Sequence, residues 1–385
     1  MHLAFVCEEY PPAPHGGTGS SYRDLAEGLV AAGHRATVVG ISTTQVLAQR
    51  VDENVRGVRV IRLPRWSSLW GTQLRGFLER RQLRQTLQEL HRADPFSVIE
   101  CSDYNGWLSG GGVGGVPLVV RIRGSNLFFD AELRRPAQAF EHCHEKRCLA
   151  KAGHIASVSR YAAERTLALC GMADRAYSVL PNAVNTDIFS PGTLGEIEPG
   201  LIVFVNSLNP KKGIEELVGA MNSILPRHLA ARLVIIGEDV RRGAGSYIEN
   251  LRERVQPELR GRLQFTGRLA PREIVTWLRR AAVACFPSHM ETFGIAALEA
   301  MAVGRPTIFT RLGPGPEILA DGVSGLLCDP RDPADITRCL DRLLDDPPFA
   351  ESLGAAARAR VLTQFDHRGW VARNLDFYER VIRAG

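Results

Sequence analysis

Two glutamates eight positions apart, Glu291 and Glu299, flank the start of a helix predicted over 293–302. An apolar stretch that ends at Pro287 and a polar loop precede this helix. The first N–H groups of a helix lack partners within it and carry the positive end of its dipole, so they suit a diphosphate. A carboxylate can accept hydrogen bonds from neighbouring hydroxyls. The pattern therefore predicts a site for a diphosphate flanked by diols, as in a sugar nucleotide.

A simpler explanation competes with this one. An acidic side chain near a helix start is favourable without any ligand, and a glutamate further along can simply face solvent. For Glu291 alone the two explanations compete evenly. The whole pattern from Cys285 to Pro306, with Gly294 leaving room for a ligand, favours the site.

The elements that would position these residues follow an alternating pattern. β-rich runs alternate with helical patterns, which is typical of α/β folds with parallel sheets. Strands are predicted at 2–7, 36–39, 58–63, 98–100, 118–123, 154–158 and 176–180, then at 201–206, 232–236, 262–266, 282–286, 307–309 and 325–328. Helices are predicted at 20–32, 73–92, 138–152 and 159–170, then at 213–224, 246–256, 271–280, 293–302, 333–344, 349–365 and 367–382.

The length of 385 residues exceeds what one hydrophobic core usually supports, so two domains are expected. The prediction is an α/β fold of two Rossmann-like, doubly wound parallel-sheet domains facing a central cleft. Residues 1–182 would form the first domain and residues 183–365 the second, with the helix 366–385 packing back on the first. Such sheets bind ligands at the carboxyl ends of their strands.

Composition narrows the class of protein. The net charge is +5, and no motif that reads DNA or RNA is present, so no nucleic-acid partner is expected. No apolar run approaches the ~20 residues that cross a bilayer, and the N-terminus does not read as a signal peptide. We expect a cytoplasmic protein with reduced cysteines, and a peripheral contact of the Arg75–Arg84 stretch with the inner face of the membrane.

Glu291 to Glu299 is an E-x7-E motif, and with its surroundings it resembles family 4 of the retaining GT-B glycosyltransferases. The resemblance extends over nearly the whole chain. Four further stretches carry it in order: the glycine loop Gly16–Gly19, the linker-like Pro181–Phe189, Lys212-Gly213, and Gly313–Gly325.

The resemblance implies roles for the matching residues. Glu299 would hold the ribose and Glu291 the hydroxyls of the donor sugar, while Lys212 would neutralise the departing phosphates. Glu291, Lys212 and Arg123 are the expected catalytic residues. The expected donor contacts are Gly16, Gly17, Gly19, Ser207, Lys212, Gly267, Arg268, Glu291, Thr292, Phe293, Gly294, Ile295 and Glu299, with Gly17 near the diphosphate, Gly267 and Arg268 beside the base, and the backbone of 293–295 on the diphosphate or sugar.

Two positions depart from the family pattern. Ser207 stands where an arginine is expected to help clamp the diphosphate, and Arg123 precedes Gly124 where histidine is common. One hypothesis joins them: Arg123 supplies the charge missing at position 207. Alternatively, Arg123 ends a strand without contacting a ligand, or the chain is a weak or inactive relative.

The expected reaction needs no metal and no other cofactor. Fixed N–H donors and Lys212 would stabilise the leaving diphosphate, and retention would follow from front-face attack, as the resemblance implies. UDP or GDP is the favoured nucleotide, and the acceptor is a hydroxyl of a glycan, lipid or secondary metabolite. Glu8, Glu9 and Asp103 are either acceptor contacts or ordinary loop carboxylates. The chain is expected to be a monomer or a homodimer.

Several alternatives remain beside this interpretation. His142, Cys143, His144, Cys148 and His154 lie close in sequence, but their spacing fits an amphipathic helix better than a zinc site. A dehydrogenase would need a tight Gly-x-Gly-x-x-Gly turn directly after the first strand, which is absent. Phosphorylases and epimerases of the same fold lack the E-x7-E stretch. A non-catalytic sugar-nucleotide-binding relative, or a partner subunit, stays the alternative from another class.

Overall fold

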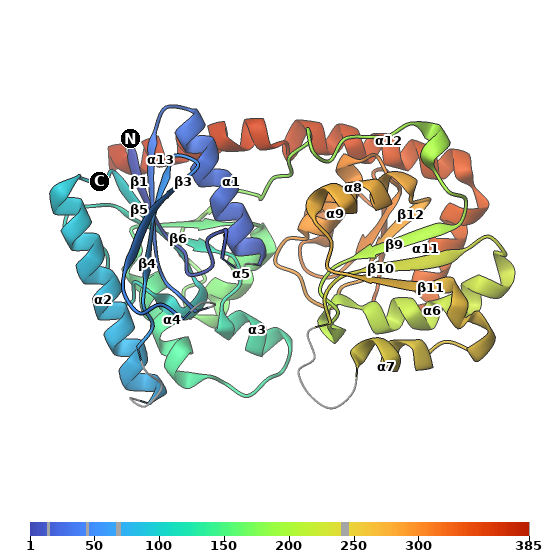
Figure 1. Ribbon diagram of the computed structural model, residues 1–385, viewed down its shortest axis with the longest axis horizontal. Helices are drawn as coiled ribbons and strands as arrows, with labels where there is room; N and C mark the ends of the chain where they lie inside the picture. Colours follow the sequence, from blue (N-terminus) through green and yellow to red (C-terminus); the bar gives the residue numbers. More distant parts are fainter. Residues whose placement is uncertain (14–15, 44–45, 67–70, 240–245, 385) are drawn as a thin grey trace. The chain divides into compact units, whose positions relative to one another are not determined.

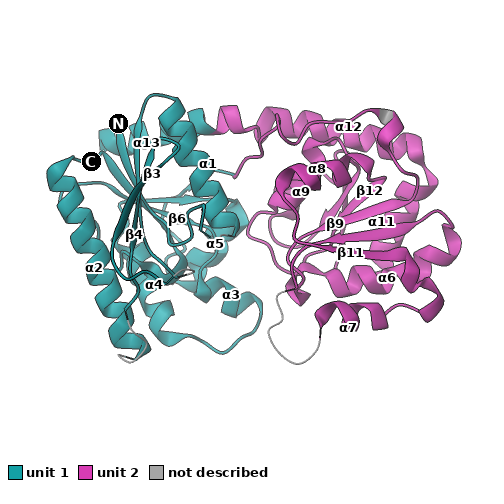
Figure 2. Ribbon diagram, viewed as in Figure 1, with its two compact units in different colours: residues 1–181, 371–385 teal, residues 182–370 magenta. Residues whose placement is uncertain are grey.

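The structure is a computed structural model that describes residues 1–13, 16–43, 46–66, 71–239 and 246–384. The chain divides into two compact units (Figure 2). Unit 1 comprises Met1–Pro181 and the residues from Val371 onward, and unit 2 comprises Asn182–Trp370. The division therefore falls inside the last helix, α13 (His367–Ala384), rather than before it. None of the described helices is long and apolar enough to cross a membrane.

Unit 1 is built on an eight-stranded sheet in the order β3-β4-β2-β1-β5-β6-β7-β8. All neighbouring strands are parallel except β3, which pairs antiparallel with β4. Figure 1 shows α1 (Gly17–Ala31) and α2 (Thr72–Ala93) on opposite sides of this sheet. The strands are β1 (His2–Val6), β2 (Arg35–Ile41), β3 (Val51–Val55), β4 (Val58–Leu63), β5 (Val98–Ser102), β6 (Leu118–Ile122), β7 (His154–Ser157) and β8 (Ser178–Val179).

Unit 2 is built on a six-stranded parallel sheet in the order β11-β10-β9-β12-β13-β14. Figure 1 shows α8 and α9 on one side of it and α6 and α7 on the other. Its strands are β9 (Leu201–Val205), β10 (Arg232–Ile236), β11 (Leu263–Gly267), β12 (Val283–Phe286), β13 (Thr307–Thr310) and β14 (Leu326–Cys328). Its helices are α6 (Ile214–Arg227), α7 (Tyr247–Glu253), α8 (Pro271–Arg280), α9 (Ile295–Ala302), α10 (Gly315–Ile318), α11 (Pro333–Asp345) and α12 (Pro347–Gln364).

Both sheets reverse their strand order at one point, between β1 and β5 in unit 1 and between β9 and β12 in unit 2. Central strands such as β9 are buried at every residue, which explains their continuous apolar sequences. The predicted pair of doubly wound parallel sheets is confirmed. In such sheets the loops at the carboxyl ends of the two strands beside the reversal form the ligand site, so a site is expected at these loops.

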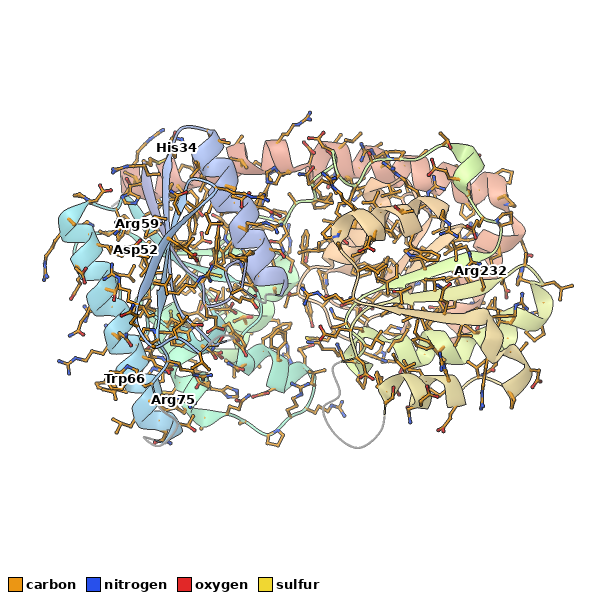
Figure 3. All side chains as sticks on the ribbon, viewed as in Figure 1. His34, Asp52, Arg59, Trp66, Arg75 and Arg232 are labelled. Carbon is orange, nitrogen blue, oxygen red and sulfur yellow. The ribbon has the colours of Figure 1, made fainter. Side chains whose placement is uncertain are left out.

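Two elements of unit 1 were not predicted. The strand β3 lies at the sheet edge with its side chains alternately exposed, so its sequence carries no apolar run. Its position is fixed instead by a tight turn at Arg56 and Gly57, both at positive φ, and by a two-pronged ion pair from Arg59 to Asp52 (Figure 3). The helix α3 (Asn126–Glu132) is short and is capped by Ser125, whose hydroxyl accepts a hydrogen bond from the N–H of Phe128.

A buried ionic cluster attaches the last helix to the sheet of unit 1. Arg121 on β6 is fully buried, and its Nε lies 2.7 Å from Oε1 of Glu100 on β5. The same guanidinium donates to Oδ1 of Asn374 at 2.8 Å, and the hydroxyl of Tyr378 donates to Glu100 at 2.7 Å. Since Asn374 and Tyr378 belong to α13, the cluster fixes where this helix packs.

Replacing Arg121 by methionine is expected to lower the free energy of unfolding by about 3–5 kcal/mol, because it leaves the buried Glu100 carboxylate without its partner. Chemical denaturation followed by circular dichroism measures the loss. The matched control removes Arg59 from its exposed ion pair with Asp52. There we expect the free energy of unfolding to fall by only about 0–1 kcal/mol. The double variant Arg121→Met/Glu100→Gln should recover part of the loss, and a cost under about 1 kcal/mol for Arg121→Met would show that the pair does not anchor α13.

Candidate active site

The loops that follow β9 and β12 meet at the reversal point of unit 2. Gly213 makes this contact possible, because its φ is 68° and a Cβ there would lie 1.7 Å from the carbonyl oxygen of Pro287. The carbonyl of Lys211 accepts hydrogen bonds from the N–H groups of His289, at 2.9 Å, and Met290, at 3.3 Å. The two loops are therefore held together by main-chain atoms before any ligand binds.

This contact places Lys212 against Glu291. The Nζ of Lys212 lies 2.7 Å from Oε1 of Glu291, and the hydroxyl of Ser288 donates to the same oxygen at 3.0 Å. Both side chains are largely buried, with 15% of the lysine and 9% of the glutamate exposed. Two residues predicted to act on the donor, 79 positions apart in sequence, are thus brought together.

The loop that carries Glu291 has a second anchor. Nε2 of His289 lies 2.8 Å from Oε1 of Glu216 on α6. The hydrogen bond with this carboxylate raises the pKa of His289 above its ordinary value, and the histidine in turn contributes to a lowered pKa of Glu216, against the effect of burial. Ser288, His289 and Glu216 were not predicted, although Ser288 and His289 lie inside the motif that was.

The helix after this loop begins later than predicted. The prediction began the helix at Phe293, whereas α9 begins at Ile295 and Gly294 precedes it with φ 114°. Gly294 is required there because a Cβ would approach the ring of Phe309 to 2.4 Å. The side chain of Phe293 is buried, and Thr292 is half-buried. The helix N-terminus is therefore formed from Ile295 onward, and Glu299 lies half-buried on α9.

The remaining predicted residues of unit 2 lie at the carboxyl ends of β9 and β11. The hydroxyl of Ser207 accepts a hydrogen bond from Asn209 Nδ2 at 2.9 Å. The carbonyl of Gly267 accepts from the N–H of Gly237 at 3.0 Å. Arg268 is exposed, and its Nη1 lies 3.8 Å from Glu238 Oε2. These three predicted positions thus share one sheet edge with Lys212 and Glu291.

In unit 1 the glycine loop binds a carboxylate of the chain itself. Glu9 accepts hydrogen bonds from the N–H of Gly16 at 3.0 Å and from the N–H of Gly19 at 2.9 Å. These groups open α1, so an internal anion takes the place that a helix N-terminus offers to phosphate. Gly17 is exposed and stands between them. Glu9 was predicted as an acceptor contact or a loop carboxylate, and its role here is to cap α1.

The side chain of Arg123 is buried against α1 and does not face solvent. Only 8% of it is exposed, its Nη1 donates to the hydroxyl of Ser21 at 2.9 Å, and its guanidinium lies 4.6 Å from the ring centre of Tyr22. Both partners belong to α1, the helix that follows the glycine loop. The guanidinium therefore adds positive charge to this helix from within unit 1.

Two acidic side chains follow the strands that flank the reversal point of unit 1. Glu8, after β1, accepts hydrogen bonds from the indole N–H of Trp107 at 3.0 Å and from Asn105 Nδ2, and burial raises its pKa to about 7. Asp103, after β5, is fully buried and accepts from the N–H of Arg123 at 2.8 Å. Burial also raises the pKa of Asp103 to about 7. Asp103 thus holds the main chain at Arg123, and its acceptor role stays a prediction.

The raised pKa of Asp103 gives a pH dependence of stability. Because the folded-state pKa of about 7 lies above the ordinary value of 3.8, the stabilising contribution is complete below about pH 4 and is lost as the pH rises towards 7. The free energy of unfolding should fall with a slope of up to about 1.4 kcal/mol per pH unit from this group. Denaturant titrations between pH 4 and 8 should show a flatter profile for Asp103→Asn, with Glu8→Gln removing the parallel contribution of Glu8. An unchanged profile in Asp103→Asn would contradict the assignment.

The histidine and cysteine cluster does not assemble into a metal site. His142 Nε2 lies 2.9 Å from Asp130, His144 Nδ1 lies 2.7 Å from the hydroxyl of Ser109, and Cys148 is buried with its Sγ 3.7 Å from that of Cys101. These side chains leave α4 (Ala139–Lys151) towards different partners. Within the described ranges, no group of three or more histidines, cysteines or acidic residues is placed to hold a metal ion.

Comparison with known proteins decides the family. Residues 193–360 match the family described as glycosyl transferases group 1, and residues 15–188 match glycosyltransferase family 4. A D-inositol 3-phosphate glycosyltransferase of Streptosporangium roseum is 30% identical over 335 residues, covering 80% of this chain and 74% of that one. The chain belongs to the group 1, family 4 glycosyltransferases. The predicted membership is confirmed.

Solved structures show the fold of this family 4 glycosyltransferase. Sucrose-phosphate synthase of Thermosynechococcus elongatus superimposes with a TM-score of 0.83 at 23% identity, over 100% of this chain and 99% of that one. The Anabaena protein HepE, in complex with UDP and glucose, gives a TM-score of 0.77 at 17% identity, over 98% and 99% of the two chains. The fold is GT-B, as predicted.

Proposed function

We propose that this glycosyltransferase moves a hexosyl group from a nucleoside diphosphate sugar to an acceptor hydroxyl with retention of configuration. The observation that carries the proposal is the 2.7 Å contact of Lys212 with Glu291 at the reversal point of the unit 2 sheet. A cation beside a carboxylate suits a donor whose diphosphate and sugar hydroxyls are adjacent. UDP and glucose in HepE support a hexose and a uridine nucleotide.

Each residue then has a defined task. Lys212 and the N–H groups that open α9 offer positive charge to the diphosphate, and Glu291 accepts hydrogen bonds from the sugar through Oε2. Both hydrogen bonds that Glu291 receives from described residues fall on Oε1, so the second oxygen has capacity for a hydroxyl. Glu299 on α9 would hold the ribose, as the resemblance implies.

The reaction follows from these charges. The bond between the anomeric carbon and the phosphate oxygen breaks, and its electron pair stays on the diphosphate. The acceptor oxygen attacks the same face of the sugar, and its proton passes to the departing phosphate oxygen. Because Lys212 and the helix N-terminus supply the stabilising charge, we propose that the transfer proceeds without a metal ion.

The test begins with the donor. Thermal unfolding in the presence of UDP, GDP, ADP and dTDP should reveal one nucleotide that adds about 2.7 kcal/mol of stability at a hundredfold excess over its Kd. Release of that nucleoside diphosphate from its hexose conjugates is then measured, and the anomeric configuration of the product is read by NMR. Binding without any release would favour the non-catalytic relative, and an inverted product would contradict retention.

We also propose that Arg123 supplies the charge that is missing at Ser207. Arg123→Ala should lower kcat/KM by about a hundredfold, which is the loss seen when one group that stabilises charge in a transition state is removed. Arg123→Lys keeps the charge but loses the planar contact with Tyr22, so it separates electrostatics from packing. Adding Ser207→Arg to Arg123→Ala should restore at least part of the rate. If Arg123→Lys is as impaired as Arg123→Ala and Ser207→Arg restores nothing, Arg123 is a packing residue.

A further inference from the structure

Unit 1 contains a cavity of about 560 Å³ beside α2. It is formed by one face of α2, the loop 107–111 and α4, elements that lie side by side in Figure 1. Its size falls within the usual range for sites that bind small molecules. We call it the arginine pocket, and its defining residues are Phe77, Arg81, Arg84, Gln88, Trp107 and Arg147.

The charge of the arginine pocket is positive. Arg81 and Arg84 stand on α2 and Arg147 on α4, all three exposed. Within the part of the chain that the structure describes, none of these three guanidinium groups forms an ion pair with a carboxylate. Arg80 differs, because its Nη2 lies 2.8 Å from Glu141 and it is buried. Three uncompensated positive charges therefore border one cavity.

Burial and the positive charge at the arginine pocket lower the pKa of a neighbouring histidine. His144 lines the same cavity, and its pKa falls to about 4, first through burial and then through the positive charges of Arg80 and Arg147. Its Nδ1 lies 2.7 Å from the hydroxyl of Ser109. The histidine is thus neutral at physiological pH, and it does not add to the charge that an anion would meet.

The arginine pocket is also lined by the aromatic side chains of Trp107 and Phe77. Trp107 is only 6% exposed, and the guanidinium of Arg80 lies 5.5 Å from the centre of its ring. Phe77, on the α2 face that lines the cavity, is 55% exposed. Trp66 and Arg75 mark the adjoining end of α2 in Figure 3. An exposed aromatic ring beside guanidinium groups that form no ion pair with a described carboxylate fits a ligand with an apolar part and an acidic part.

We propose that the arginine pocket binds an organic oxyanion, a phosphate or carboxylate group carried on an aromatic or apolar body. The guanidinium groups of Arg81, Arg84 and Arg147 bind the acid group, and Trp107 and Phe77 contact the body. The indole N–H of Trp107 reaches Glu8, so the pocket adjoins the reversal point of unit 1. The site concerns unit 1 alone and stands whether or not the proposed transfer is correct.

Isothermal titration calorimetry of the full chain with 1-naphthyl phosphate, 1-naphthoate and neutral 1-naphthol tests the proposal. We expect binding of one or both acids and at least tenfold weaker binding of the naphthol. The variant Arg81→Ala/Arg84→Ala should bind the acid more weakly, by roughly tenfold or more for each arginine. This is the effect of losing a hydrogen bond to a charged group. The matched control Arg92→Ala/Arg135→Ala removes two exposed arginines that do not line the cavity and should leave the affinity within about twofold.

The two acids separate a phosphate from a carboxylate ligand, and vesicles separate a lipid from a soluble ligand. Vesicles of phosphatidylcholine with phosphatidic acid test the membrane. If the chain co-sediments with them, loses this in Arg81→Ala/Arg84→Ala and binds neither naphthyl acid, the pocket is overturned in favour of a membrane contact. Equal binding of acid and naphthol, or equal losses in the two double variants, would overturn it as well. Added salt should weaken acid binding by the wild type more than by Arg81→Ala/Arg84→Ala.

Discussion

Replacing Lys212 by alanine should lower kcat/KM by about 10²–10³-fold, the loss seen when one fixed charge-stabilising group is removed from a transition state. Lys212 is the lysine that the contact between the loops after β9 and β12 places on Glu291, at 2.7 Å. The negative charge on the diphosphate grows as the bond to the sugar breaks. The variant should therefore lose more in kcat than in affinity for the donor.

The neighbouring Lys211 is the matched control for this experiment. It has the same side chain and, like Lys212, is neither fully buried nor exposed. Its main-chain carbonyl, which a substitution retains, accepts the hydrogen bonds from His289 and Met290. Lys211→Ala should keep its rate within about threefold of the wild type. Steady-state kinetics of nucleoside diphosphate release, together with a thermal unfolding curve for each variant, make the comparison. Equal rates for Lys212→Ala and Lys211→Ala would remove Lys212 from the mechanism.

The elements that could be predicted from sequence are those whose residues are buried on a regular period. Strands such as β4, β10 and the helix α8 have the predicted ends, because apolar residues, glycine and proline mark them. The edge strand β3 escaped prediction since half of it faces solvent, and its turn uses Arg56 at positive φ, a conformation that propensities do not favour.

The residues of the candidate site can be named from the sequence, but their arrangement cannot. Lys212 and Glu291 are recognisable from their motifs, yet their ion pair depends on Gly213 packing against Pro287, a contact between distant segments. The helix α9 begins at Ile295 because Gly294 takes a φ of 114° beside the ring of Phe309 on β13, a contact that lies outside the local sequence. Likewise, nothing local indicates that Glu9 folds back onto the glycine loop.

Glu291 provides the sharpest test of how the donor sugar is held. Of its two carboxylate oxygens, Oε1 accepts the hydrogen bonds from both Lys212 and Ser288. We expect Glu291→Ala to lose about a hundredfold or more in kcat/KM, because it removes the sugar contact and also releases Lys212 from its position. Glu291→Gln keeps an acceptor oxygen but loses the charge that holds the lysine. It should fall between the wild type and Glu291→Ala.

Donor analogues that lack one sugar hydroxyl separate the two losses. The wild type should discriminate against the analogue whose missing hydroxyl is the one bound by Oε2, because the carboxylate oxygen is then left without a partner in a largely buried site. Glu291→Ala has no such oxygen, so it should use the full donor and that analogue with nearly equal kcat/KM. The coupling free energy from this cycle, about 1–3 kcal/mol, belongs to the hydrogen bond alone, since the displacement of Lys212 affects both donors equally. If every deoxy analogue keeps its full penalty in Glu291→Ala, the glutamate does not hold the sugar, and its task is limited to positioning Lys212.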